Sequence, residues 1–217
     1  MVRHRLPGEA TIRIHSIVRR SRVGGPGLRC LVHTQGCTLA CPGCFNPGAQ
    51  DPLGGREYGV HELAQSIIGD RGIEGVTISG GEPLQQAPAV AELLSELQAA
   101  GLTTVLYSGY TLAEITALHG SEGVLAATDV LIDGRYQATA PCHDGYRGSA
   151  NQQFHFLTGR YGPQDFRPQP AAIEVEIAPD GTVSLRGFPG DEVRSRLDEL
   201  LHHGGAPAAP GRRPQER

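Results

Sequence analysis

The chain has 217 residues, which suits one domain and is short for two. Its net charge is −4, so it lacks the basic composition that is typical of proteins that bind nucleic acid. No apolar run approaches the roughly 20 residues of a membrane span, and the N-terminal residues lack the apolar region of a signal peptide. We therefore expect a cytoplasmic protein that binds neither membranes nor nucleic acid.

The first part of the chain alternates predicted strands and helices. Apolar helical spacing predicts helices over 60–68 and 90–97, and Thr111 with Glu114 matches a capping box before a third helix. Strands are expected where apolar and β-branched residues alternate or cluster, at 11–18, 28–34, 75–79, 103–107 and 129–133. This order predicts an α/β fold with a parallel sheet and helical crossovers.

The second part of the chain has weaker patterns. Residues 134–170 are rich in Gly, Pro and Gln and show no clear period. The segments 173–177 and 182–186 flank a Pro-Asp-Gly turn, which predicts a β-hairpin. Apolar spacing over 193–201 predicts a last helix, and the composition from 204 onward is typical of disorder. We expect a core over 11–160, a hairpin and helix extension over 161–203, and a disordered tail over 204–217.

Three cysteines crowd into the segment GCTLACPGCF, residues 36–45. Cys37, Cys41 and Cys44 form C-x3-C-x2-C directly after a predicted strand, and Pro42 with Gly43 suits a tight turn between the last two. Thiolates are soft ligands that favour zinc or iron–sulfur clusters. Three thiolates on a four-iron cluster would leave one iron without a protein sulfur.

The spacing alone leaves a structural zinc as an alternative, because such sites take four ligands. The fourth ligand would then be His33, Cys30 or Cys142. Cys30 alternates with Val32 on its predicted strand and is more simply a small buried residue.

Small and polar residues follow the next two predicted strands. Gly80 and Gly81 lack Cβ atoms, so a ligand could approach their backbone. Ser108 ends the following strand, and ligands gather at the carboxyl ends of parallel strands. An ordinary turn explains the glycine segment equally well, and for Ser108 alone it is the better explanation. Arg29, in the segment before the cysteines, is expected to be a buried ion-pair partner.

Six segments in this order resemble the radical S-adenosylmethionine (SAM) enzymes, and more narrowly the glycyl-radical-enzyme activases, closest to the activating proteins of anaerobic (class III) ribonucleotide reductase. They are PGLRC (26–30), QGCTLACPGCFN (35–46), SGGEPL (79–84), YSGYT (107–111), DVLIDG (129–134) and RGSANQ (147–152). The resemblance implies an incomplete parallel β/α barrel with the C-terminal hairpin and helix appended.

The resemblance also implies the site and its cofactors. Cys37, Cys41 and Cys44 would hold a 4Fe-4S cluster whose fourth iron binds SAM. The cluster would cleave SAM reductively to a 5′-deoxyadenosyl radical, which would generate a glycyl radical on a partner enzyme. The implied SAM contacts are Gly80, Gly81, Glu82, Pro83, Ser108 and Phe45.

The implied partners are a glycyl radical enzyme and a flavodoxin- or ferredoxin-type electron donor. Two alternatives stay open: a radical SAM enzyme that modifies a peptide or a small metabolite, and a non-catalytic iron–sulfur or zinc binding protein. The roughly 65 residues after Gln152 depart from the family pattern. We expect the hairpin there to protect an edge of the sheet, although it could also contact the partner.

Overall fold

The computed structural model describes residues 10–142, 144–167, 173–177, 179–181, 183–188, 193, 195–196 and 199–200. The predicted tail over 204–217 lies outside the described residues. So do several positions of the predicted last helix, although 193, 195–196 and 199–200 are helical. Among the described residues, no helix is long and apolar enough to cross a membrane.

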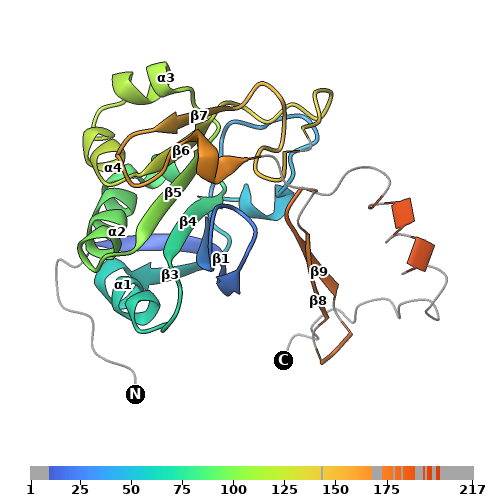
Figure 1. Ribbon diagram of the computed structural model, residues 1–217, viewed down its shortest axis with the longest axis horizontal. Coiled ribbons are helices and arrows are strands. Elements are labelled where there is room, and N and C mark those ends of the chain that lie inside the picture. Colours follow the sequence, from blue (N-terminus) through green and yellow to red (C-terminus); the bar gives the residue numbers. More distant parts are fainter. Residues whose placement is uncertain are drawn as a thin grey trace, which may run out of the picture.

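A seven-stranded sheet forms the centre of the molecule, in the order β3-β1-β2-β4-β5-β6-β7 (Figure 1). β2, β4, β5 and β6 are parallel, as the sequence predicted, while β1, β3 and β7 run antiparallel to their neighbours. The strands are β1 (Thr11–Ser21), β2 (Arg29–Thr34), β3 (Arg56–Gly59), β4 (Gly75–Gly80), β5 (Thr103–Ser108), β6 (Val130–Asp133) and β7 (Gln153–Phe156).

The two outer strands β3 and β7 were not predicted. Each has only four residues, and both are partly exposed at the edge of the sheet. Edge strands are short and bury little apolar surface, so they leave no clear alternation in the sequence.

The helices cover one face of the sheet (Figure 1). They are α1 (Val60–Ile68), α2 (Ala87–Ala99), α3 (Leu112–Ala117) and α4 (Glu122–Ala126). Both halves of the predicted capping box are formed, between Thr111 and Glu114. Alternate residues of the parallel strands, such as Val32, Ile78 and Leu106, are fully buried with these helices in the main core. Burial of each such side chain stabilises the fold by about 1.5–3 kcal/mol.

The opposite face of the sheet has two parts. Over β5 and β6, aromatic side chains from β7 and its flanking loops form a second core around Val105, Val130 and Ile132. Over β1, β2 and β4, the strand residues line a cavity instead. The helices therefore occupy one face, and the cavity opens on the other.

Arg29 is fully buried at the start of β2. Its guanidinium donates hydrogen bonds only to neutral oxygens among the described residues, so the predicted buried ion pair is not borne out. The acceptors are Thr77 Oγ1 (2.8 Å), Thr103 Oγ1 (2.9 Å), the hydroxyl of Tyr161 (3.1 Å) and the carbonyls of Pro26 (3.1 Å), Val76 (2.7 Å) and Thr103 (3.0 Å). These bonds satisfy a buried cation at the base of the strands.

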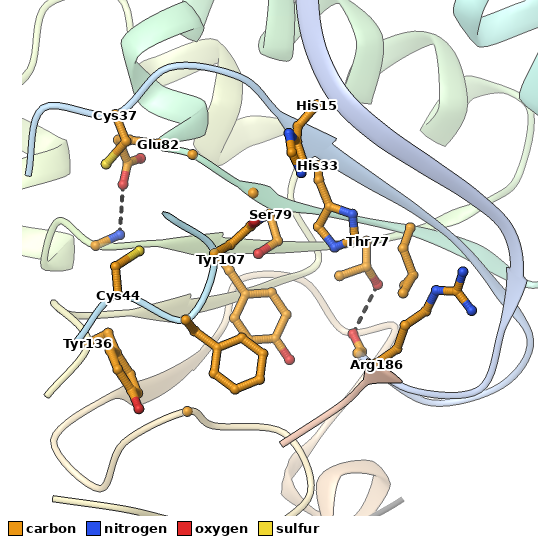
Figure 2. Close-up of a pocket in the computed structure, with 18 of the residues that line it drawn as sticks. His15, His33, Cys37, Cys44, Thr77, Ser79, Glu82, Tyr107, Tyr136 and Arg186 are labelled. Atoms are coloured by element: carbon orange, nitrogen blue, oxygen red, sulfur yellow. Dashed lines mark hydrogen bonds between the residues drawn. The ribbon is translucent and has the colours of Figure 1, made fainter. Parts of the chain in front are cut away.

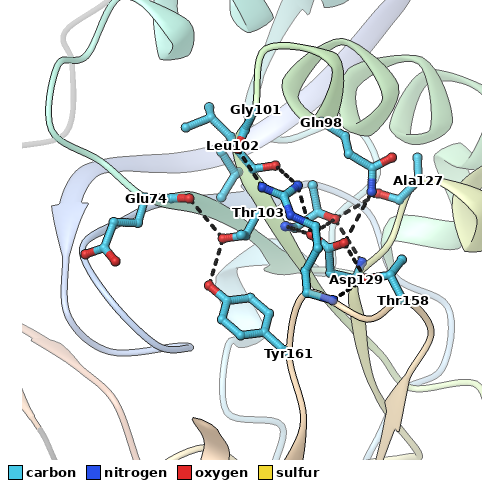
Figure 3. Close-up of polar contacts among 12 residues, drawn as sticks. Glu74, Gln98, Gly101, Leu102, Thr103, Ala127, Asp129, Thr158 and Tyr161 are labelled. Carbon is cyan, nitrogen blue, oxygen red and sulfur yellow. Dashed lines mark hydrogen bonds and ion pairs between the residues drawn. The ribbon is translucent and has the colours of Figure 1, made fainter.

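Asp129 joins the elements at the same end of the sheet (Figure 3). Its buried carboxylate accepts hydrogen bonds from Thr104 N (2.8 Å) and Thr158 Oγ1 (2.7 Å), and Arg160 lies 3.5 Å away. Arg160 also donates to the carbonyls of Gly101 and Leu102 after α2. The network ties α2, β5 and the loop after β7 together.

The predicted hairpin is present as β8 (Glu174–Ile177) and β9 (Val183–Arg186), which pair antiparallel in a separate two-stranded sheet. Among the described residues, neither strand of the hairpin pairs with a strand of the main sheet, whose edges are β3 and β7. The expectation that the hairpin protects a sheet edge is therefore wrong. Instead, the carboxylate of Glu174 accepts hydrogen bonds from Ser21 Oγ and Arg22 N, both at 2.6 Å.

Candidate functional site

The cysteine loop leaves the carboxyl end of β2 and closes on a short 3-10 helix, η1 (Pro47–Ala49). Gly36 N donates to the carbonyl of Ala49 (2.8 Å), and Cys37 N donates to that of Gln50 (3.0 Å). These backbone bonds make the loop a closed structure that is held at both ends.

Cys41 and Cys44 lie at the two ends of a tight turn. Cys44 N donates to the Cys41 carbonyl (3.1 Å), and Gly43 has φ +69. Proline second and a left-handed glycine third are the residues that a type II turn favours, so the predicted turn is confirmed. Ala40, just before it, has φ 49, a conformation that is costly for a residue with a Cβ.

All three thiols of the motif line one cavity of about 600 Å³, and Figure 2 shows Cys37 and Cys44 in it. Burial raises the pKa of Cys37. Among the described residues, no three His, Cys, Asp or Glu side chains come close enough together to hold a single metal ion.

The two candidate fourth cysteines lie elsewhere. Cys30 is fully buried in the main core with the helices, on the face of β2 opposite the cavity, and burial raises its pKa to about 12. Cys142 does not line the cavity. His33 does line it, and its Nδ1 lies 2.9 Å from Ser16 Oγ.

Five of the six predicted SAM contacts line the same cavity. They are Phe45, Gly80, Gly81, Glu82 and Ser108. Pro83 does not: it is buried at the start of the 3-10 helix η2 (Pro83–Gln86), where its fixed φ suits the first turn. The structure thus brings the cysteine loop and the ends of β4 and β5 to one place.

The space beside Gly80 and Gly81 that a Cβ atom would occupy is filled by the backbone of another segment. A Cβ on Gly80, whose φ is +109, would lie 2.4 Å from Thr34 N. A Cβ on Gly81 would lie 2.3 Å from the Gly36 carbonyl oxygen. Gly81 N donates to the carbonyl of Thr34 (2.8 Å), and Glu82 N donates to that of Gly36 (2.9 Å). The glycines therefore let the end of β4 lock against the cysteine loop.

Glu82 links the ends of β4 and β5 through its carboxylate, which is 1% exposed. It accepts hydrogen bonds from Leu84 N (3.0 Å), Ser108 Oγ (2.9 Å) and Gly109 N (2.8 Å). Burial raises its pKa, while these three donors act in the opposite direction. Among the described residues that line the cavity, Glu82 has the only carboxylate, and three donors hold it in place.

The far end of the cavity contains residues that the sequence did not assign to the site. Figure 2 shows Cys37 and Cys44 toward one end, and His33, Thr77 and Arg186 toward the other. Burial lowers the pKa of His33 to about 4, and the nearby side chains of His15 and Arg186 act in the same direction, so its imidazole is neutral at pH 7.

The sequence could have predicted two of these lining residues from the alternation of side chains along the strands. Strand residues alternate between the two faces of a sheet, so the alternates of the core residues Val32 and Ile78 had to face the other way. Those alternates are His33 and Ser79, and both line the cavity. No sequence pattern placed the hairpin residues 184–188 there.

The model of one protein family, described as "4Fe-4S single cluster domain", matches residues 23–155. This match covers the cysteine loop and the strand ends of the cavity. The chain belongs to this family, and it is a radical SAM protein of the glycyl-radical-enzyme activase type.

Curated relatives carry names that agree with this assignment. The "Anaerobic ribonucleoside-triphosphate reductase-activating protein" of Vibrio cholerae is 34% identical over 146 residues, which cover 63% of this chain and 92% of the relative. The protein of the same name from Escherichia coli is 32% identical, covering 62% and 92%. The "Pyruvate formate-lyase-activating enzyme" of Clostridium pasteurianum is 35% identical, covering 76% and 66%.

Among solved structures, QueE from Escherichia coli is a distant match, with a TM-score of 0.40 and 18% identity over 46% of this chain and 54% of that one. The hairpin lies beyond the segment that the family model matches.

Proposed function

We propose that this protein generates a glycyl radical on a partner enzyme of the anaerobic ribonucleoside-triphosphate reductase type. The observation that carries the proposal is that Cys37, Cys41 and Cys44 share one cavity with the Gly80–Glu82 segment. A bound 4Fe-4S cluster in its reduced state would supply one electron for cleavage of the C5′–S bond of SAM into methionine and a 5′-deoxyadenosyl radical. Removal of a Cα hydrogen atom from a partner glycine by that radical would leave the glycyl radical and 5′-deoxyadenosine.

The residues present fit such a cluster. Cys37, Cys41 and Cys44 would hold it, since thiolates are the ligands that iron–sulfur clusters use. The closed loop and its type II turn would orient the thiols, and the contact between Gly81 and Gly36 would fix the loop against β4. Glu82 would place its carboxyl group at the SAM side of the cavity.

We infer further that the sheet is an incomplete β/α barrel. Its four parallel strands carry helices on one face, and the other face carries the cavity over β2 and β4 and the aromatic core over β5 and β6. We propose a core over 11–160 and an extension over 161–203. The electron donor would be of flavodoxin or ferredoxin type, and the protein would work in the cytoplasm, without membranes or nucleic acid.

A second candidate function keeps the radical chemistry and replaces the partner enzyme by a peptide or a small metabolite. Residues 184–188 of the hairpin line the cavity, and this added wall narrows the space that a protein loop would enter. A purified partner enzyme discriminates the two. A glycyl-radical EPR doublet on the partner supports the first candidate. SAM cleavage without that doublet supports the second.

The test of the shared chemistry is release of 5′-deoxyadenosine from SAM by anaerobically reconstituted protein with dithionite. We expect release by the native protein and none by Cys41→Ala. Cys142→Ala is the matched control, since Cys142 does not line the cavity, and it should keep full activity. Absence of release from well-loaded native protein would refute the proposal and favour a non-catalytic metal-binding protein.

A further inference from the structure

Phe188, two residues after β9, reaches into the cavity beside the cysteine loop. Its ring centroid lies 5.1 Å from that of Phe45 and 6.5 Å from that of Tyr107. Phe45 directly follows Cys44. A residue from the C-terminal extension therefore contacts the loop that carries the three thiols.

The hairpin is anchored so that Phe188 takes this position. At one end, the carboxylate of Glu174 accepts hydrogen bonds from Ser21 Oγ and Arg22 N. Within the hairpin, Arg186 pairs with Glu176 on the neighbouring strand. Gly187 then has φ +95, a conformation that glycine adopts without strain, and turns the chain ahead of Phe188.

Gly148 lies directly beside the Phe188 ring. A Cβ added at Gly148 would lie only 3.0 Å from Phe188 Cε1 and 3.2 Å from the ring of Tyr136. A side chain at position 148 would thus press against two of the aromatic rings that line the cavity, and both rings would have to shift slightly. Glycine there leaves room for both rings.

The two ends of the cavity differ in chemistry. Aromatic rings gather near the thiols, where Tyr136 lies 6.3 Å from Phe45 and Phe188 packs against Phe45 and Tyr107. Imidazole, hydroxyl and guanidinium groups gather at the other end, around His33, Thr77 and Arg186 (Figure 2). Aromatic side chains hold flat heteroaromatic rings by stacking and edge contacts. The flat ring of SAM is adenine.

We propose that Phe188 is a positioning residue that holds the adenine ring of SAM together with Phe45, and that the C-terminal hairpin is a wall of the active site. This inference rests on the proposed function, because it concerns the same cavity. It assigns a role in ligand binding to the C-terminal extension, which lies outside the residues 23–155 that the family model matches.

The first test measures binding without turnover. The affinity of reconstituted protein for S-adenosylhomocysteine, which contains the same adenosyl group, is measured by calorimetry. We expect Phe188→Ala to bind about tenfold more weakly, as is typical for loss of one aromatic contact to a base. Ile177→Ala is the matched control, because Ile177 lies in the same hairpin, is 71% exposed and does not line the cavity. It should bind like the native protein.

Two further variants separate positioning from folding. Phe188→Tyr keeps the ring and should restore native affinity, whereas Phe188→Leu keeps apolar bulk and should bind several-fold more weakly. Iron content and melting temperature should match the native protein in both. If Phe188→Ala fails to fold, the comparison of the tyrosine and leucine variants decides. Native affinity in the leucine variant would overturn the inference.

Failure of this inference is distinguishable from failure of the proposed function. If native protein neither cleaves SAM nor binds S-adenosylhomocysteine, the proposed function itself is wrong and the inference with it. If native protein cleaves SAM and the Phe188→Ala variant binds S-adenosylhomocysteine with native affinity, the function stands. The hairpin is then no part of the adenosyl site.

Discussion

Replacement of Gly81 by alanine tests the packing that joins β4 to the cysteine loop. The new Cβ would lie 2.3 Å from the Gly36 oxygen and 2.8 Å from the Ala49 oxygen. Both neighbours are backbone atoms, which would have to move by about 1 Å to reach ordinary van der Waals separation. The shift would strain two hydrogen bonds, from Gly36 N to Ala49 and from Glu82 N to Gly36.

The expected cost follows from these two effects. Overpacking of a tight site costs about 1–3 kcal/mol, and each weakened hydrogen bond adds up to about 1 kcal/mol. We expect Gly81→Ala to lower the free energy of unfolding by about 3 kcal/mol, which corresponds to a melting temperature lower by about 10 °C for a chain of this size. Because Cys37 follows Gly36, cluster loading should fall as well.

The assay combines thermal unfolding with iron and sulfide content after anaerobic reconstitution. Gly159→Ala is the matched control, because a Cβ at that position meets no atom within 4 Å. Its stability should change by less than about 0.5 kcal/mol. Native stability and native iron content in Gly81→Ala would refute the argument that backbone packing at this glycine positions the loop.

Two further predictions concern buried polar groups. The pKa of His33 is lowered to about 4, so between pH 6.5 and 4 the unfolded chain binds a proton that the folded chain does not, and the free energy of unfolding should fall by at most about 3 kcal/mol as the pH drops through that range. Urea unfolding at pH 7.5 and 5.0 should show a smaller loss of stability for His33→Asn than for the native protein. An equal loss in both proteins would show that His33 is not the cause. Asp129→Ala should lower the free energy of unfolding by about 3 kcal/mol, because it leaves the buried donors of Thr104 and Thr158 unpaired. Arg160→Ala should lower it by less, because the Arg160 side chain is 35% exposed. Equal losses of stability in chemical denaturation would show that the ion pair between Asp129 and Arg160 dominates instead.

Much of the central fold could be predicted because its signals are local. The order of apolar residues in the chain shows which of them face the core. This holds for the helical spacing in α1 and α2 and for the buried runs of β4 to β6. The Thr111–Glu114 capping box also closes within four residues. The antiparallel outer strands β3 and β7 carry no such signal, since short edge strands bury little.

The sequence also predicted some parts of the candidate site and not others. The three thiols and the two glycines of the SGGEP segment lie at short, fixed spacings, so the motif itself identified them. The structure adds a reason for the glycines that the sequence did not predict: they admit the backbone of Thr34 and Gly36 from another segment. Pro83 belongs to the motif but starts η2 and does not line the cavity.

By itself, the sequence determined the parallel α/β core, the three metal-ligating candidates and the family, because each depends on residues that are close together in the chain. Only the tertiary structure decided that the C-terminal hairpin lines the cavity rather than protecting a sheet edge. That outcome depends on Glu174 meeting Ser21 and on Phe188 meeting Phe45. Contacts between segments so far apart are set by the way the whole chain packs, and no local spacing encodes them.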